Sequence, residues 1–78
     1  MIDVLLFAQL QEKLGKDRLS IKADNLGSVK ELKAQLAADY QLDGLDNAMI
    51  AVNEEYATED AGLTNGDIVA FIPPVSGG

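Results

Sequence analysis

The segment "IVAFI", residues 68–72, carries the clearest information about the fold. Five consecutive apolar residues predict a β-strand with apolar side chains on both faces, which is typical of a strand inside a sheet. The opening stretch "IDVLLFA" (2–8) has the same character. We therefore predict that the first and last strands are neighbours in the middle of one sheet and pair in parallel.

The stretch "SVKELKAQLAADY" (28–40) predicts the main helix. The side-chain oxygen of Ser28 can accept a hydrogen bond from the N–H of Glu31, and the Glu31 side chain can bond back to the cap. Apolar residues then recur at helical spacing, so one stripe should lie on the sheet. Its members are Val29, Leu32, Leu36 and Tyr40.

The remaining segments complete an α+β pattern. Residues 9–16 predict a short helical turn ended by Gly15, and 17–24 alternate as a half-buried strand that forms a hairpin with the first. Residues 49–57 predict a strand, a polar turn and a short return. The order favours a β-grasp (ubiquitin-like) roll, a mixed sheet of four to five strands with one main helix packed across it. The predicted domain is 1–72, followed by an extended tail, 73–78.

Composition excludes several classes of function. The 78 residues suffice for one domain, and they include no cysteine and no histidine. Disulfides, thiolate metal sites and histidine proton shuttles are therefore excluded, and without an EF-hand loop we expect no metal site. A net charge of −7 argues against nucleic acid and anionic membranes as partners. No run approaches the roughly 18 apolar residues of a membrane span, so we expect a cytoplasmic protein.

The charges are unevenly distributed along the chain. All six basic residues lie in the first 33 positions against five acids, whereas residues 34–78 carry eight acids and no base. This pattern is consistent either with an acidic, well-solvated surface or with electrostatic steering toward a basic partner near the C-terminus.

The terminus "FIPPVSGG" (71–78) is the only stretch in which we predict chemistry. We interpret the Glu54–Glu55 pair as solvated turn residues, and no nucleophile has a base in reach. Pro73 and Pro74 cannot continue a sheet ladder and favour an extended path. Gly77 and Gly78 carry no Cβ and can enter a narrow channel, and ATP could activate the carboxylate of Gly78 as an acyl-adenylate. The alternative is a frayed terminus.

The chain resembles the MoaD family, the small sulfur-carrier subunits of molybdopterin synthase. The resemblance spans nearly all residues and is carried by "VLLFAQLQEKLG", "SVKEL", "AVNEEYA", "LTNGDIVAFIPPV" and the closing "SGG". It implies that an E1-like enzyme uses ATP to adenylate Gly78. Sulfur from a sulfurtransferase then converts the acyl-adenylate to a thiocarboxylate, which donates sulfur to cyclic pyranopterin monophosphate to give molybdopterin.

The resemblance also implies a partner and a docking surface. The partner is the large, MoaE-like synthase subunit, in a heterotetramer whose large-subunit active site receives the tail. The tail residues that would enter that site are Val75, Ser76 and Gly77, ahead of Gly78. The positions that match the family's docking surface are Phe7, Tyr56 and Ile72, with Pro73 and Pro74. No cofactor is expected on the chain itself, and the isolated chain should have no autonomous active site.

Three hypotheses of function remain open on the sequence. The chain could be a sulfur carrier, either of the molybdopterin type or of the related thiamine type. It could be a ubiquitin-like modifier conjugated to lysines through Gly78. It could also be a plain β-grasp interaction module in which the tail has no role.

Overall fold

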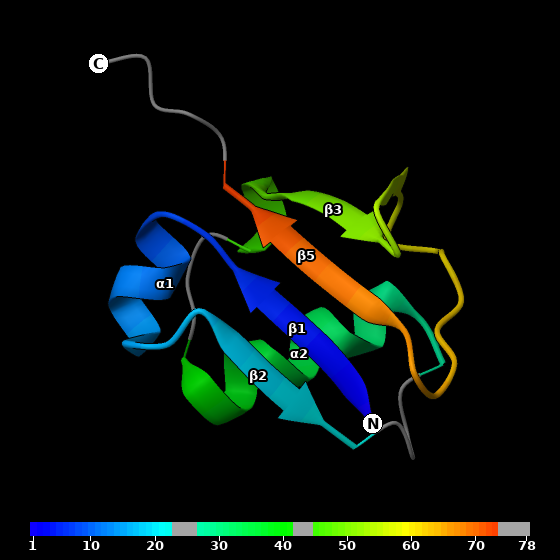
Figure 1. Cartoon of the computed structure of the whole chain (residues 1–78), viewed down its shortest axis with the longest axis horizontal. Helices are drawn as coiled ribbons and strands as arrows, with labels where there is room; N and C mark the ends of the chain where they lie inside the picture. The colour runs from blue at the N-terminus through cyan, green and yellow to red at the C-terminus, as the bar shows by residue number, and fades with distance from the viewer. Residues whose placement is uncertain (23–26, 42–44, 74–78) are drawn as a thin grey trace.

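A five-stranded mixed sheet with strand order β2-β1-β5-β3-β4 forms the body of the molecule (Figure 1). The computed structural model describes residues 1–22, 27–41 and 45–73, apart from the side chain of residue 46. The elements in chain order are β1 (Ile2–Leu6), α1 (Gln9–Leu14), β2 (Arg18–Ile21), α2 (Val29–Tyr40), the 3-10 helix η1 (Leu45–Asn47), β3 (Met49–Val52), β4 (Glu55–Ala57) and β5 (Ile68–Ile72).

The predicted parallel pairing of the first and last strands is confirmed. Val4 of β1 lies opposite Val69 of β5, and both strands are inside the sheet, with β5 third of the five strands and β1 beside it. β2 pairs antiparallel with β1 on one side, and β3 pairs antiparallel with β5 on the other. This arrangement is the α+β roll predicted from the order of the elements.

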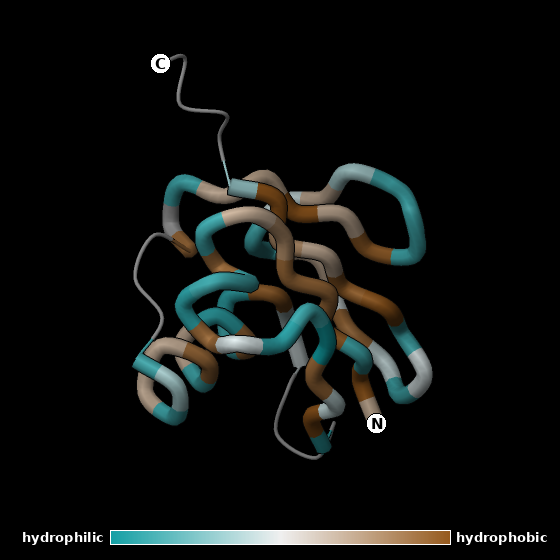
Figure 2. The backbone as a smooth tube through the Cα atoms, turned by 60° about the vertical axis from the view of Figure 1, so that its left-hand side comes forward, coloured by the Kyte–Doolittle hydropathy of each residue, from teal (hydrophilic) through white to brown (hydrophobic). Residues whose placement is uncertain are grey.

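The hydrophobic core lies between the sheet and α2, which packs across one sheet face (Figure 1). Alternation sends every second side chain of the central strands toward the helix, and these side chains are at most 1% exposed. In Figure 2 the extended segments of the backbone are largely hydrophobic, and hydrophilic residues occupy several turns and parts of the helical coils. The fully buried members of the core are Ile2, Val4, Leu6, Val29, Leu32, Leu36, Val69 and Phe71.

Two details of the predicted α2 are wrong. The Ser28 hydroxyl does accept from the Glu31 N–H, at 3.4 Å, but the Glu31 carboxylate accepts from the N–H of Gly27 at 2.5 Å instead of bonding to the cap residue. Tyr40 is 39% exposed because the last turn of α2 has no buried residue and ends beyond the core. Lys33 is buried instead, and its ammonium pairs with Glu59.

The turn between β1 and α1 holds an unusual backbone conformation. Ala8 has φ 51° and ψ −124°, values that glycine adopts readily and that other residues rarely adopt. The turn is closed by the Leu10 N–H, which donates to the Phe7 carbonyl at 3.1 Å. The direction in which the chain leaves β1 at Phe7 is therefore set by a strained residue.

We expect Ala8→Gly to raise the free energy of unfolding by about 1 kcal/mol, because relief of the strain outweighs the added freedom of the unfolded chain. Urea denaturation measures the change. Ala37→Gly is the matched control, since Ala37 is exposed in the interior of α2 and the same substitution there should cost about 1 kcal/mol. Equal losses at both positions would show that Ala8 is not strained.

Among the described residues, no helix is both long and apolar enough to cross a membrane.

Candidate functional site

The sheet face opposite α2 carries a continuous row of apolar side chains. Strand register places Leu5 beside Ala70, Ala70 beside Ala51, and Ala51 beside Tyr56, so that the row crosses four strands. The sequence predicted strands that are apolar on both faces, and the structure shows α2 and the core on only one of those faces. The second apolar face is therefore available to a partner.

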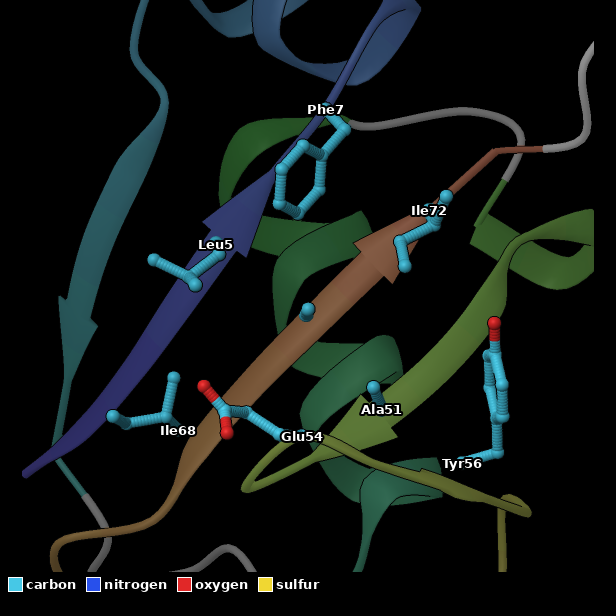
Figure 3. A pocket seen from close by; sticks show the side chains of 8 residues that line it. Leu5, Phe7, Ala51, Glu54, Tyr56, Ile68 and Ile72 are labelled. Atoms are coloured by element: carbon cyan, nitrogen blue, oxygen red, sulfur yellow. The ribbon is translucent and has the colours of Figure 1, made fainter.

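A shallow hollow lies in the middle of this surface (Figure 3). Several of its large side chains are well exposed, from 40% for Ile68 to 76% for Tyr56. Such exposure is unusual for apolar residues that lie next to one another on a small protein. We call this surface the open face, and it is lined by Leu5, Phe7, Ala51, Glu54, Tyr56, Ile68, Ala70 and Ile72.

The three residues predicted to form a docking surface come together on the open face. Phe7 directly follows β1, Ile72 ends β5, and Tyr56 projects from β4 (Figure 3). Phe7 is 43% exposed and Ile72 is half-buried, so neither side chain is a core residue. Their role in docking stays a prediction, but the geometry required for a shared surface is present.

The predicted tail begins at one end of the open face. β5 ends at Ile72, the last residue of the predicted domain, and Pro73 follows it in a half-buried position. A partner that covers the open face would therefore lie next to the point where the tail begins. The other residues predicted to act in the tail lie outside the described residues, and their roles stay predictions: Pro74, Val75, Ser76, Gly77 and Gly78.

A hydrogen-bonded network fixes the far end of the open face. Asn53 and Glu54 form the two-residue turn between β3 and β4, and both have positive φ, 52° and 71°. The Asn53 side chain accepts from the Ile68 N–H at 3.0 Å and donates to Asp67 at 3.0 Å. The turn is thereby tied to the start of β5. The sequence interpretation missed this network, although Asn at a tight turn was an available signal.

Two carboxyl groups near the open face have lowered pKa values. Hydrogen bonds from Arg18, at 2.5 Å, and Ser20, at 3.1 Å, lower the pKa of Asp3 below its ordinary value of 3.8. The backbone N–H of Thr64, at 2.9 Å, and the Asn53 amide lower the pKa of Asp67 in the same way. Both carboxyl groups are thus held ionised by local donors.

We expect acid to destabilise the fold through these two groups. A lowered folded-state pKa stabilises the protein above the unfolded value of 3.8, and this contribution is lost as the pH falls through the folded pKa. We measure the urea concentration at the unfolding midpoint from neutral pH to about pH 2.5. This midpoint concentration should decrease once the pH is below about 4. Asp67→Asn should be less stable than the parent at neutral pH, and the difference should shrink as the pH falls. A difference that is constant with pH would contradict this.

The open face has the chemistry of a binding surface. Within residues 1–22, 27–41 and 45–73, no group of three or more acidic, histidine or cysteine side chains is arranged to hold a metal ion. Glu54 is the single ionisable carboxylate on the face, and neither Tyr56 nor Glu54 has a neighbouring nucleophile among the lining residues. The open face therefore offers a partner a mainly apolar surface with one carboxylate.

Comparison with known proteins places this geometry in a family. The ThiS family matches residues 4–78. The molybdopterin synthase sulfur carrier subunit of Escherichia coli is 40% identical over an alignment of 82 positions that covers 100% of both chains.

Two solved structures extend the comparison to the fold. SAMP1 from Haloferax volcanii has a TM-score of 0.82 at 26% identity, over 99% of this chain and 98% of that one. A chain from the complex of subunits 1 and 2 of the molybdopterin-converting factor of Helicobacter pylori has a TM-score of 0.70 at 28% identity, over 99% of this chain and 97% of that one. Sequence and fold agree over the whole length, and the chain therefore belongs to the ThiS/MoaD family.

Proposed function

We propose that the chain is the sulfur carrier subunit of a molybdopterin synthase. The observation that carries this proposal is 40% identity, along the whole length of both chains, to a protein of that name. The open face supports it, because a carrier without its own active site needs a surface on which a catalytic partner can dock. The chain would work in the cytoplasm and would need no bound cofactor of its own.

The reactive group in this proposal is the carboxylate of Gly78. An E1-like enzyme transfers AMP from ATP to that carboxylate, and pyrophosphate leaves. A sulfur donor at the oxidation level of hydrosulfide then displaces AMP and leaves a thiocarboxylate. When the thiocarboxylate passes its sulfur to cyclic pyranopterin monophosphate, on the way to molybdopterin, the terminus returns to a carboxylate by reaction with water. The chain would thus be a sulfur-donating subunit of an enzyme.

The partner in this proposal is the large, MoaE-like synthase subunit, in a heterotetramer. The Helicobacter pylori structure named above is a complex of two subunits of a molybdopterin-converting factor. In this chain, Phe7 and Ile72 bring the open face to the end of β5 from which the tail continues. One partner could therefore cover the open face and receive the tail in the same orientation.

The proposal is tested by intact-mass measurement. The chain is co-expressed with its activating enzyme and a sulfurtransferase, then purified and weighed. We expect a mass increase equal to the exchange of one oxygen atom for sulfur, with the change located in the C-terminal peptide. The chain expressed without the activating enzyme is the control, and an unchanged mass in both samples would reject the proposal.

A second candidate is conjugation to lysines as a protein modifier, which is favoured by the similarity to SAMP1, a small archaeal modifier protein. Both functions begin with the same adenylate, and they differ in product. A modifier would appear in conjugates of higher mass that resist reducing agents. A carrier would appear only at its own mass, increased by the exchange of one oxygen atom for sulfur.

A further inference from the structure

The open face has a single charged side chain, and that side chain stands out among its neighbours. Glu54 is the one residue among the eight that line the hollow whose side chain is charged at neutral pH. The side chain extends from the β3–β4 turn back across β5 toward Ile68 (Figure 3). A carboxylate therefore lies over apolar surface that a docked protein would cover.

Glu54 makes no hydrogen bond or ion pair with any residue in the described part of the chain. The neighbouring polar cluster is different, because Asp3 is paired with Arg18 at 2.5 Å and is already neutralised within the chain. Among the residues that line the hollow, the unneutralised charge is therefore negative and is located at Glu54. A protein that covers this face without supplying a cation would desolvate an unpaired carboxylate, which is unfavourable.

The backbone at Glu54 adds a second observation. Its φ of 71° favours glycine or asparagine, and the preceding residue, Asn53, is of the type preferred in such a turn. Glutamate at this position is strained, and among the described residues no hydrogen bond or ion pair of its side chain compensates for the strain. The carboxylate of Glu54 therefore has no polar partner that would explain its place in the fold.

Glu54 lies at the opposite end of the open face from the start of the tail. Glu54 lies at the Ile68 end of β5, whereas the tail continues from the Ile72 end. Ile68 and Ile72 are four positions apart along β5, or about 13 Å at a rise of ~3.3 Å per residue. A partner that receives the tail thus meets the apolar surface first and the carboxylate beyond it.

We propose that Glu54 is a specificity-determining residue of the open face, which pairs with an arginine or lysine side chain of the protein that receives the tail. This pairing fixes the orientation of the docked partner and discriminates against proteins that lack a cation at that position. The inference rests on the proposed function, in which that protein is the large synthase subunit.

The test is a binding titration of the full chain with the large synthase subunit at low and high ionic strength. Glu54→Gln keeps the size and backbone strain of the side chain and removes its charge. We expect the affinity to fall about 5- to 20-fold at low ionic strength and by less at high ionic strength, because the pairing is electrostatic. Glu54→Lys should weaken binding further, because it places two cations against each other.

Glu55→Gln is the matched control, since Glu55 is the adjacent acid, is exposed, and does not line the open face. Its affinity should stay within about twofold of the parent. Thermal unfolding of Glu54→Gln should match the parent, which separates a binding effect from a folding effect.

The possible failures are distinguishable. If the parent acquires sulfur and binds the large subunit while Glu54→Gln binds equally well at both ionic strengths, the inference about Glu54 is wrong and the proposed function stands. If Glu55→Gln weakens binding as much as Glu54→Gln, general charge is responsible and the inference is also wrong. If the parent neither acquires sulfur nor binds the large subunit, the proposed function fails and the inference fails with it.

Discussion

Deletion of Gly78 is expected to abolish sulfur transfer while leaving the free energy of unfolding unchanged. In the proposed function the terminal carboxylate is the group that becomes the thiocarboxylate, and the deletion moves that carboxylate back by one residue. The last strand ends at Ile72, so the deleted residue lies six positions beyond the sheet. The activity of the reconstituted synthase should fall to the level found without the carrier, and urea denaturation should give the parent midpoint.

Two control variants separate position from composition. Ser76→Ala changes the tail but keeps its length and its terminal Gly-Gly, so it should retain most of the activity. One bulky residue added after Gly78 should be as damaging as the deletion, because it displaces the carboxylate and, in the proposed function, would have to enter the narrow channel expected to receive the two glycines. Full activity of the chain without Gly78 would reject the terminal carboxylate as the reactive group.

The second large effect is expected from a comparison of two phenylalanines. Phe71 is fully buried in the core, whereas Phe7 is 43% exposed on the open face. Phe71→Ala should lower the free energy of unfolding by about 3–5 kcal/mol, a large part of the stability of a small domain. Phe7→Ala should lower it by less than about 1 kcal/mol but weaken binding to the large subunit about 30-fold or more, as expected of an aromatic hot spot.

Urea denaturation measures the stability of both variants, and a binding titration measures the affinity of those that fold. Tyr56→Phe serves as the reference on the open face, because it keeps the ring and removes only the hydroxyl. If Phe7→Ala unfolded the protein, the assignment of Phe7 to the open face would be wrong. If Phe7→Ala folded and bound normally, the open face would not be the docking surface.

The central architecture could be predicted because burial leaves a clear pattern in the sequence. The runs "IDVLLFA" and "IVAFI" are apolar on both faces, and both belong to the two central strands. The main helix could be located from the cap at Ser28 and the stripe that follows it. The end of the helix could not be judged in the same way, because the stripe indicates direction and does not indicate how far the core extends. Tyr40 continues the periodicity and is nevertheless exposed.

The candidate site could be predicted only in part. Phe7, Tyr56 and Ile72 were identified through a family resemblance, and the apolar pattern alone did not distinguish them from core residues. The position of Glu54 depends on a tertiary contact, since the turn that carries it is tied to β5 through the Asn53 side chain. No local pattern in the sequence reports such a contact. The charge pattern indicated an acidic C-terminal half, but it did not indicate which acid lies over apolar surface.

The pairing of β1 with β5 also has a consequence for folding during synthesis on the ribosome. β1 is the first strand to be synthesised and β5 is the last, and the two strands are neighbours inside the sheet. A nascent chain that has emerged only to the end of β4 can form the β1–β2 hairpin and α2, but it has no central partner for β1. Long-range pairing of this kind slows folding relative to a helical bundle of the same size. The surface offered to a partner is assembled from residues 5–7, 51–56 and 68–72. A nascent chain in which β5 has not yet emerged therefore cannot form the complete open face.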